Sequence, residues 1–520
     1  MILLSFLVCI HSLFAQGTIA VSGRVTDETG QPMIGAGVVQ KGTTNGTVTD
    51  LDGSYSITVP NGAILEFSSV GYVTQERAAN QPRMDVQLEL DQLMIEETVV
   101  VGYGVQRKSD VTGAISSVKA SDIENRTITR AEQALQGKTA GVALITTTAQ
   151  PGASPTVRVR GFSSNGTSDP LYVVDGLLVD NIGNLDPNNI ASIEVLKDAA
   201  SAAIYGAQAG NGVVLVTTKT GTKGTSSITY ELQYSLNNLV RRPKLLDSTQ
   251  AIQQFLEMDK TRTQADVDAL ITNGVWDGKF STDWYKESFE VSPTLRHTVG
   301  MQGANDKGSF YLALSSLNDQ GIIVGNRDFY KRLTLMANAD YQIKPWLKVG
   351  TSNNLGYARS AGINDGSSNS IYGSMVAAGL NLQPYWASTY PADKLPIAMQ
   401  TQMATGYTLL QDEDGNYYMT LGASEYCHPR VSMRRNEVDN NTYSIDGTTY
   451  LNFTPVKGLV FTSRLGYRLN DASRYSYGNV FYGSTSVNKL KNSVNRNNST
   501  NFYYQWENFV NYNHSFGRHE

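Results

Sequence analysis

The chain has 520 residues, of which 17% are charged, and its formal net charge is -5. This sparsely charged, slightly acidic composition gives no reason to expect nucleic-acid binding, and no stretch reaches the roughly 18 consecutive apolar residues that a transmembrane helix needs. The 47 glycines and 28 tyrosines, with many Ser, Thr and Asn residues, are typical of an all-β surface or membrane-barrel protein.

The N-terminus reads MILLSFLVCIHSLFAQG, an apolar run that ends at the small residue Ala15. This pattern predicts a secretory signal peptide over residues 1–15, although the usual positively charged n-region is missing. The alternative is a buried N-terminal strand. Cleavage near Ala15 removes Cys9 and leaves only Cys427, so we expect no disulfide framework.

Residues 20–92 carry short stretches of period-two alternation, such as Tyr55, Ile57 and Val59, separated by turn signals such as Asp52-Gly53. They predict a small β-sandwich. The stretch DLDG at 50–53 resembles the start of a calcium loop, but it lacks a third ligand before the glycine and the distal Glu. A hairpin turn is therefore favoured, and no metal site is predicted.

Residues 95–106 form a connecting segment that contains an apolar strand, Thr98 to Tyr103. Glu96-Glu97 precede this strand and Arg107-Lys108 follow it, and no partner strand is predicted at hairpin distance. Such a strand is an unpaired edge available to another chain. The alternative is a linker strand that adds to the preceding sandwich.

Residues 107–222 alternate short strands with short helical turns and predict an α+β domain. Ile123, Ala131 and Leu135 have helix-compatible spacing that ends at Gly137. In TVRVRGF, Arg158 and Arg160 stand two apart and are expected to share one face of a strand. In YVVDG, Asp175-Gly176 is predicted to be a structural turn at a strand end.

Five motifs in this region resemble, in order, the plug of SusC/RagA-like TonB-dependent outer-membrane transporters: EETVVVGYGVQRKSDVTGAISSV, QALQGKTAGV, VRVRGFSS, PLYVVDG and IEVLKDAASAAIYGAQAGNGVVLVTTK. The sandwich resembles the carboxypeptidase-regulatory-like domain, which has a transthyretin-like fold. The resemblance implies that the connecting segment is the TonB box, comprising Thr98, Val99, Val100, Val101, Gly102 and Tyr103. It also implies a plug motif at Arg158, Arg160 and Gly161, whose arginines could pair with carboxylates on the inner barrel wall. The alternative for either arginine is a solvated face of the plug.

Residues 225–520 show long, regular alternation. Ile228, Tyr230 and Leu232 oppose Thr229 and Glu231, and the same period recurs at 333–343, 347–357 and 459–469. Strands of roughly ten residues with one apolar and one polar face predict a transmembrane antiparallel β-barrel. About eight strands can be identified, whereas plugged barrels need about 22. We therefore expect the N-terminal part of a barrel, with a truncated non-functional remnant as one alternative.

Long polar stretches between the predicted strands are expected to be extracellular loops. Tyr385, Trp386, Tyr390 and Tyr407 lie in the longest one and could contact a sugar or a peptide, with loop packing as the alternative. The five histidines are scattered without metal-ligand spacing, and no catalytic residue is predicted. They are His11, His297, His428, His514 and His519.

The predicted protein is therefore mainly β and not an enzyme. The resemblance implies import of an oligosaccharide or peptide across the outer membrane, in partnership with TonB and a SusD-like lipoprotein. It also implies that the N-terminal domain and the plug face the periplasm and that no cofactor is needed. The alternative from another class is a secreted or surface β-rich binding protein, or adhesin.

Overall fold

The computed structural model describes residues 18–512 except 28–29, 44, 70–71, 89–97, 102–103, 108–114, 125, 147, 149, 163–167, 223–225 and 363–374. The predicted signal peptide lies outside the described residues. The chain divides into two compact units, one comprising Met1–Val99 and Val105–Thr112 and the other Val100–Gly104 and Gly113–Glu520. Among the described residues, no helix is long and apolar enough to cross a membrane.

The first unit contains a β-sandwich of two small sheets, with strand orders β4-β1-β7 and β3-β2-β5-β6. Its strands are β1 (Thr18–Thr26), β2 (Gly37–Gln40), β3 (Gly46–Val48), β4 (Ser54–Pro60), β5 (Ile64–Ser68), β6 (Gln75–Ala78) and β7 (Val86–Gln87). Alternate residues such as Tyr55, Ile57 and Val59 are buried between the sheets, as their spacing predicts. Asp50 caps the DLDG turn, because its Oδ1 accepts the backbone N–H groups of Asp52 and Ser54.

A separate two-stranded hairpin follows, formed by β8 (Thr98–Val101) and β9 (Gly104–Arg107). The expectation that no nearby strand pairs with Thr98–Tyr103 is therefore wrong. Gly102-Tyr103, which are outside the described residues, connect the two strands. Each strand of a two-stranded sheet still has one edge that is not paired within that sheet.

The plug in the second unit is built on a five-stranded sheet of order β10-β15-β16-β13-β14, in which only β13 and β16 pair in parallel. Its elements are β10 (Ile115–Lys119), α3 (Ala120–Ile123), η2 (Ala131–Leu135), β11 (Val142–Ile145), β12 (Thr156–Val159), β13 (Leu171–Val174), β14 (Leu177–Val179), η3 (Pro187–Asn189), β15 (Ile190–Leu196), α4 (Ala199–Ala202), η4 (Ala203–Asn211) and β16 (Val213–Thr218).

Two details of the plug depend on local backbone preferences. The single helix predicted around Ile123 to Leu135 is instead two short pieces, α3 and the 3-10 helix η2. The β-branched run Thr127-Ile128-Thr129 between them disfavours a continuous helix. The turn between β13 and β14 consists of Asp175 (φ 47°) and Gly176 (φ 86°), and positive φ at both positions is what a tight two-residue type I′ hairpin requires.

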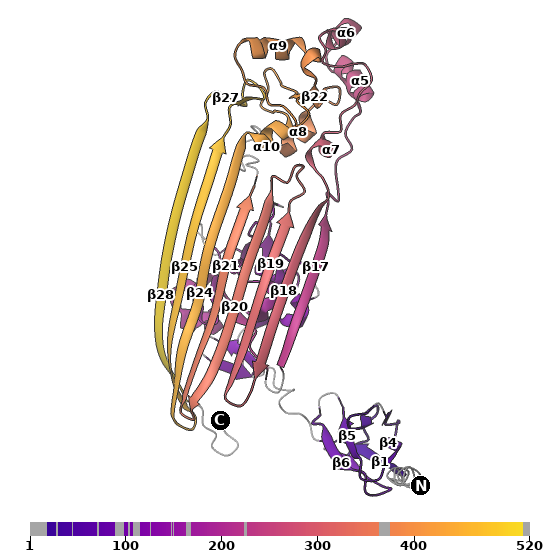
Figure 1. Ribbon diagram of the computed structural model, residues 1–520, viewed down its shortest axis with the longest axis vertical. Coiled ribbons are helices and arrows are strands. Elements are labelled where there is room, and N and C mark those ends of the chain that lie inside the picture. Colours follow the sequence, from indigo (N-terminus) through magenta and orange to yellow (C-terminus); the bar gives the residue numbers. More distant parts are fainter. Residues whose placement is uncertain are drawn as a thin grey trace, which may run out of the picture. The chain divides into compact units, whose positions relative to one another are not determined.

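The rest of the second unit is dominated by an eight-stranded antiparallel sheet, which we call the wall sheet (Figure 1). Its strands pair in chain order: β17 (Ser226–Asn237), β18 (Ser292–Ala304), β19 (Gly308–Gln320), β20 (Phe329–Lys344), β21 (Leu347–Ala361), β24 (Asn436–Val456), β25 (Leu459–Gly478) and β28 (Ser493–Tyr512). The predicted number of strands is confirmed. Figure 1 shows the plug elements behind this sheet, and the plug core packs against Tyr311, Ala313 and Met336 of β19 and β20.

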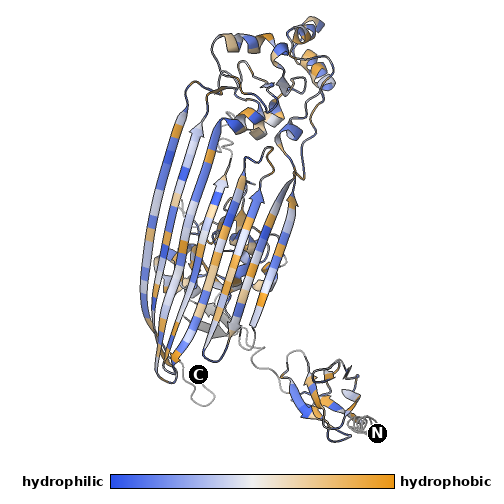
Figure 2. Ribbon diagram, viewed as in Figure 1, coloured by the Kyte–Doolittle hydropathy of each residue, from blue (hydrophilic) through white to orange (hydrophobic). Residues whose placement is uncertain are grey.

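The wall sheet exposes its apolar side chains and buries its polar ones, which is the opposite of a water-soluble sheet. Its outward residues are apolar and exposed, for example Ile228 at 74% and Leu333 at 47%, whereas the intervening Thr334 and Asn338 are at most 5% exposed. Figure 2 shows the resulting bands of alternating hydropathy along the strands. The predicted alternation is therefore real, and its polar side faces the plug.

Short turns at 305–307, 345–346 and 457–458 join the strands at one end of the wall sheet, and long connections join them at the other. We call residues 238–291, 375–435 and 479–492 the loop cap. Its elements are α5 (Ser248–Met258), α6 (Gln264–Thr272), α7 (Trp284–Ser288), α8 (Met375–Asn381), β22 (Thr389–Tyr390), η5 (Ala392–Lys394), α9 (Ile397–Ala404), β23 (Tyr417–Tyr418), α10 (Pro429–Arg434), β26 (Phe481–Tyr482) and β27 (Asn488–Lys489).

Candidate functional site

The interface between the plug and the wall sheet is centred on Asp186, a plug residue with no exposed surface. Its Oδ1 accepts the backbone N–H of Asn188 at 2.9 Å and so caps the 3-10 helix η3. Its Oδ2 accepts a hydrogen bond from Ser315 Oγ of β19 at 2.6 Å and lies 3.4 Å from Arg332 Nη2 of β20. One buried carboxylate thus links the plug to two strands of the wall.

Two arginines of the wall surround this carboxylate. Arg332 Nη1 donates to the carbonyl oxygen of Gly183 at 2.7 Å, and Arg296 of β18 donates to the carbonyl oxygen of Ile128. Burial by itself disfavours the carboxylate. The charges of Arg332 and Arg296, together with the hydrogen bonds from Ser315 and Asn188, outweigh burial and hold the pKa of Asp186 below its usual value. Asp186 is therefore ionised, and its charge is matched from the wall.

Further hydrogen bonds extend this contact along the strands. Tyr311 OH donates to Asn189 Oδ1 at 3.0 Å, and Asn188 Nδ2 donates to Glu231 Oε1 at 2.9 Å. Asn338 Nδ2 lies 2.7 Å from Thr218 Oγ1 and 2.8 Å from the carbonyl oxygen of Lys219. The plug is therefore held by many separate polar contacts, each of which contributes about 1 kcal/mol.

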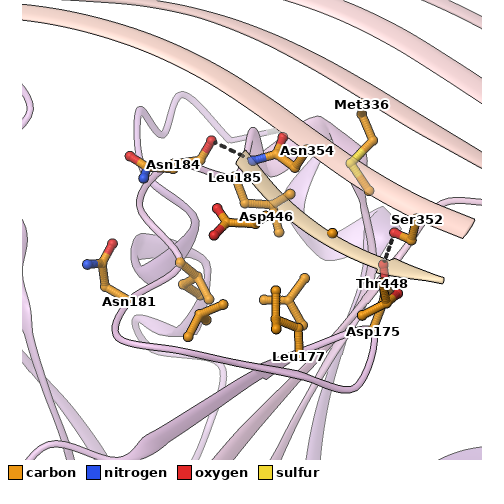
Figure 3. A pocket seen from close by; sticks show the side chains of 14 residues that line it. Asp175, Leu177, Asn181, Asn184, Leu185, Met336, Ser352, Asn354, Asp446 and Thr448 are labelled. Atoms are coloured by element: carbon orange, nitrogen blue, oxygen red, sulfur yellow. Dashed lines mark hydrogen bonds between the residues drawn. The ribbon is translucent and has the colours of Figure 1, made fainter. Parts of the chain in front are cut away.

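The β13–β14 turn makes a second anchor. Asp175 Oδ2 accepts a hydrogen bond from Thr218 Oγ1 within the plug at 2.6 Å. It also accepts one from Ser352 Oγ of β21 at 2.6 Å (Figure 3). Gln505 of β28 uses both ends of its amide on the same turn, donating to the carbonyl oxygen of Gly176 at 2.6 Å and accepting from the backbone N–H of Leu178 at 3.1 Å. Asp175-Gly176 thus forms the predicted turn, and the structure also places it against the wall.

A small cavity of about 30 Å³ with a mixed polar and apolar lining lies beside this anchor (Figure 3). Asp446 of β24 and Asn354 of β21 contribute to its lining, and Asn354 Nδ2 is 3.4 Å from the carbonyl oxygen of Asn184 in the plug. A cavity of this size holds about one water molecule. Polar anchors and the apolar contacts of Tyr311, Ala313 and Met336 therefore both contribute to this interface.

The predicted plug motif does not form the anchor. Arg158 lies on β12, but that strand ends at Val159, and Arg160 adopts φ 58° beyond it, so the two arginines do not share a strand face. Arg158 forms an ion pair with Asp169, which belongs to the plug and not to the wall. Gly161, with φ 91°, continues this left-handed turn.

The ion pairs between plug and wall among the described residues have the opposite polarity to that expected, with arginine on the wall and aspartate on the plug. They are Arg332 with Asp186 and Arg468 with Asp180, the latter at 3.0 Å. Sequence reasoning missed Asp186, Arg296 and Arg332. The signal was available, because Arg332 has the same parity as Thr334 and Asn338 on the polar side of its strand.

Within the predicted TonB box, the structure describes only the backbone pairing of β8 and does not describe Gly102 and Tyr103. Elsewhere, the described residues contain no group of three or more His, Cys, Asp or Glu side chains arranged to hold a metal ion.

Comparison with known proteins agrees with this architecture. Residues 107–213 match the model of the TonB-dependent receptor plug domain, and residues 21–101 match that of the CarboxypepD_reg-like domain. TonB-dependent receptor P26 of Formosa agariphila is 32% identical over 523 aligned residues, covering 96% of this chain and 48% of the relative. TonB-dependent receptor SusC of Bacteroides thetaiotaomicron is 35% identical over 336 residues, covering 62% of this chain and 32% of the relative. These matches support a SusC/RagA-like TonB-dependent receptor.

Solved structures of the RagAB peptide transporter share the receptor's fold. One has a TM-score of 0.64 at 22% identity and is covered by this chain over 46% of its length; the 'open-open' state has a TM-score of 0.66 and is covered over 47%. The chain spans about half the length of the curated relative P26 and about a third of that of SusC. The wall sheet corresponds to the β-barrel of these receptors.

The loop cap of this receptor has a packed core of its own, and the predicted ligand-binding aromatics contribute to it. Tyr385 and Tyr390 are at most 6% exposed, and Tyr390 OH donates to the carbonyl oxygen of Val275. Tyr407 packs on Tyr482 with ring centroids 4.4 Å apart. These contacts favour loop packing as the role of Tyr385, Tyr390 and Tyr407.

His428 of the loop cap has no exposed surface and is brought next to Ser388 and Glu287. Its Nδ1 accepts the backbone N–H of Arg430 at 3.0 Å, so the proton of the neutral ring is assigned to Nε2, which faces Ser388 Oγ at 3.0 Å. Ser388 Oγ donates to Glu287 Oε2 at 2.9 Å. The imidazole therefore donates to the serine and cannot act as its base, so the cluster is structural.

We expect this buried histidine to make the loop cap sensitive to acid. Burial, followed by the charge of Arg430, lowers the pKa of His428 to about 3. Between the ordinary pKa of about 6.5 and pH 3 the unfolded loop binds a proton that the folded loop does not, so stability falls as the pH falls, by roughly 1.4 kcal/mol per pH unit. Thermal unfolding of the loop cap, followed by tryptophan fluorescence at pH 7, 6 and 5, should show this slope.

The matched control is His428→Gln, which keeps a side-chain N–H but does not titrate. In this variant the stability of the loop cap should fall less steeply with falling pH than in the wild type, by roughly 1.4 kcal/mol per pH unit. This difference in slope does not depend on the stability of the variant at pH 7. Equal slopes for the two proteins would show that His428 does not carry the acid sensitivity.

Proposed function

We propose that this receptor imports a large nutrient, an oligosaccharide or a peptide, across the outer membrane with energy supplied through TonB. The observation that carries the proposal is a plug seated on the inward polar face of a sheet whose outward face is apolar and exposed. Apolar-out, polar-in strands are what a membrane barrel requires. The likeness to TonB-dependent receptors along almost the whole chain supports the energy source.

The proposed mechanism starts at β8. TonB adds a strand to the unpaired edge of the β8–β9 hairpin, using main-chain hydrogen bonds that depend little on side chains. Pulling on residues 98–103 then loads the plug, whose contacts with the wall are many and individually weak. Such contacts break one after another at lower force than a single apolar interface would, because local opening costs less than global unfolding.

The orientation follows from the ends of the wall sheet. Short turns are expected on the periplasmic side and long connections outside the cell, so the loop cap is extracellular, and the N-terminal domain and plug face the periplasm. In this arrangement a SusD-like lipoprotein partners the receptor at the cell surface. The protein is not an enzyme in this proposal, and its mechanism needs no cofactor.

A soluble adhesin is the competing function, and the polarity of the wall sheet disfavours it. A water-soluble sheet buries its apolar side chains, whereas here Ile228 and Leu333 are exposed and Asn338 is buried. An adhesin would also need no charge-matched plug such as the one that Asp186 and Arg332 hold in place.

The test is uptake of two fluorescently labelled mixtures, one of oligosaccharides and one of peptides, by cells that express the full-length receptor with its partner lipoprotein. We expect import of at least one mixture, and we expect deletion of TonB or addition of a protonophore to abolish it. Import that continues without TonB, or import of neither mixture, would contradict the proposal.

A further inference from the structure

A cleft of about 320 Å³ lies between the plug and the wall on the side of the long connections. The ends of β17, β18 and β19 that adjoin those connections form one side of it. The other side is formed by the plug residues Thr127, Thr129, Gln133, Thr146, Thr148, Gln150, Pro151, Gly152 and Ala153. Its volume falls in the range of about 300–1,000 Å³ that is typical of small-molecule sites. Thr127, Thr146 and Thr148 are exposed, so solutes can reach it.

Hydroxyl and amide groups dominate the described lining of this cleft. The hydroxyls belong to Thr127, Thr129, Thr146, Thr148 and Ser235, and amides such as Gln133 and Asn237 stand among them. Each of these groups can both donate and accept hydrogen bonds. That is the complement of a ligand rich in hydroxyl groups, which also donate and accept at the same atoms.

Local hydrogen bonds hold the polar lining in place. Gln133 Oε1 accepts the backbone N–H groups of Thr129 and Arg130 at 3.0 and 3.2 Å, which orients its Nε2 as a donor. On the wall, Asn237 Nδ2 donates to Thr294 Oγ1 at 2.7 Å, and that hydroxyl donates to Asp319 Oδ1 at 2.6 Å. Pre-set groups of this kind lower the cost of binding.

Charge does not match an anionic ligand. Asp319 is the only ionisable side chain in the described lining, and it already accepts from Thr294. The nearby cations bind plug carbonyl oxygens instead: Arg130 Nη1 donates to that of Gly152 at 2.8 Å, and Arg296 donates to that of Ile128. A carboxylate, sulfate or phosphate would meet no basic side chain among the described lining residues.

The apolar surface of the described cleft lining is aliphatic and not aromatic. The described lining contains no aromatic side chain, and its aliphatic surface comes from residues such as Pro151, Ala153 and Ile322. A peptide gains much of its affinity from pockets for apolar or charged side chains. A site built to hydrogen-bond hydroxyl groups also rejects ligands that lack them, because its polar groups are then left unpaired.

We propose that this cleft binds an uncharged carbohydrate, and hence that the receptor's nutrient is a neutral oligosaccharide. The inference rests on the proposed function and narrows it to one ligand class. The cleft lies between the loop side and the plug, so a sugar bound there contacts both the plug and the wall.

The test measures binding to the purified full-length receptor with its partner lipoprotein, using immobilised neutral oligosaccharides, sulfated and uronic oligosaccharides, and a tryptic peptide mixture. We expect binding to members of the neutral set only. In the double variant Thr127→Val/Thr146→Val, which removes two exposed hydroxyls and keeps the side-chain shape, Kd should rise about tenfold. Thr220→Val, at an exposed plug threonine outside the cleft, is the matched control and should leave Kd unchanged.

Three results would overturn the inference: preferred binding of peptides or anionic glycans, binding of none of the sets, or neutral-glycan binding that the double variant leaves unchanged. Thermal unfolding of both variants checks that they are folded. The proposed function is judged separately by TonB-dependent uptake. TonB-dependent import of peptides would support the proposed function and refute a carbohydrate ligand. Binding of neutral glycans in the cleft without TonB-dependent uptake would support the carbohydrate site and refute the proposed function.

Discussion

Replacing Asp186 by asparagine should loosen the plug from the wall sheet at a cost of about 3–5 kcal/mol, because it removes one partner of a buried ion pair. Arg332 and Arg296 then keep their charges in a site where Asp186 itself has no exposed surface. Equilibrium denaturation of the detergent-solubilised receptor, followed by near-UV circular dichroism, measures the loss. Trypsin cleavage of the plug should accelerate in parallel.

The matched control is Asp169→Asn, which breaks the ion pair with Arg158 at a half-exposed carboxylate. Exposed pairs contribute about 0–1 kcal/mol, so this variant should remain close to wild type. Adding Arg332→Met to Asp186→Asn should cost less than the sum of the two single changes, since both act on one contact. Equal effects of the substitutions at 186 and 169 would show that Asp186 does not anchor the plug.

Val100→Pro should reduce uptake to the level of cells without TonB. Proline has no backbone N–H and cannot contribute fully to a strand ladder, and strand addition at β8 depends on those main-chain bonds. Uptake of the two labelled mixtures by living cells is the measurement. The amount of receptor in the outer membrane and its heat-dependent shift on gels should stay normal, because β8 is not part of the wall sheet.

Val100→Thr is the control for this change, since threonine keeps the N–H and the β-branched side chain that suits a strand. We expect wild-type uptake from it. Normal uptake by the proline variant would assign the TonB box elsewhere. Loss of uptake in both variants would instead indicate that TonB recognises the side chain of Val100.

The periodicity of the sequence was enough to predict the wall sheet. A side chain's direction on a strand depends only on whether its position is odd or even, so Leu333 and Thr334 are assigned to opposite faces without any knowledge of the fold. The same reasoning predicts the buried Tyr55, Ile57 and Val59 of the sandwich. The Asp175-Gly176 turn was also predictable, because few residues other than glycine, aspartate and asparagine accept positive φ.

Spacing patterns in the sequence gave wrong predictions where a strand or helix ends within the pattern, and they missed a strand with a weak pattern. The parity of Arg158 and Arg160 suggests one shared face, but the strand ends between them and the backbone turns at Arg160. Helix-compatible spacing from Ile123 to Leu135 is interrupted by the β-branched run at 127–129. The partner of β8 was missed because β9 contains Gly104 and Gln106 and carries little strand signal of its own.

Sequence alone thus determined the strands of the sandwich and of the wall sheet, their inward and outward faces, and the resemblance to the family, since these depend on local periodicity and ordered motifs. The tertiary structure alone decided which charges meet. Asp186 and Arg332 are separated by more than a hundred positions along the chain, and only the packing of η3 against β19 and β20 places them 3.4 Å apart. The two sides of the cleft are also distant in sequence, because Thr127 and Thr148 of the plug lie across it from Asn237 and Asp319 only when the plug is seated. Local periodicity carries no information about such long-range pairs, which form when two separately patterned surfaces are brought together.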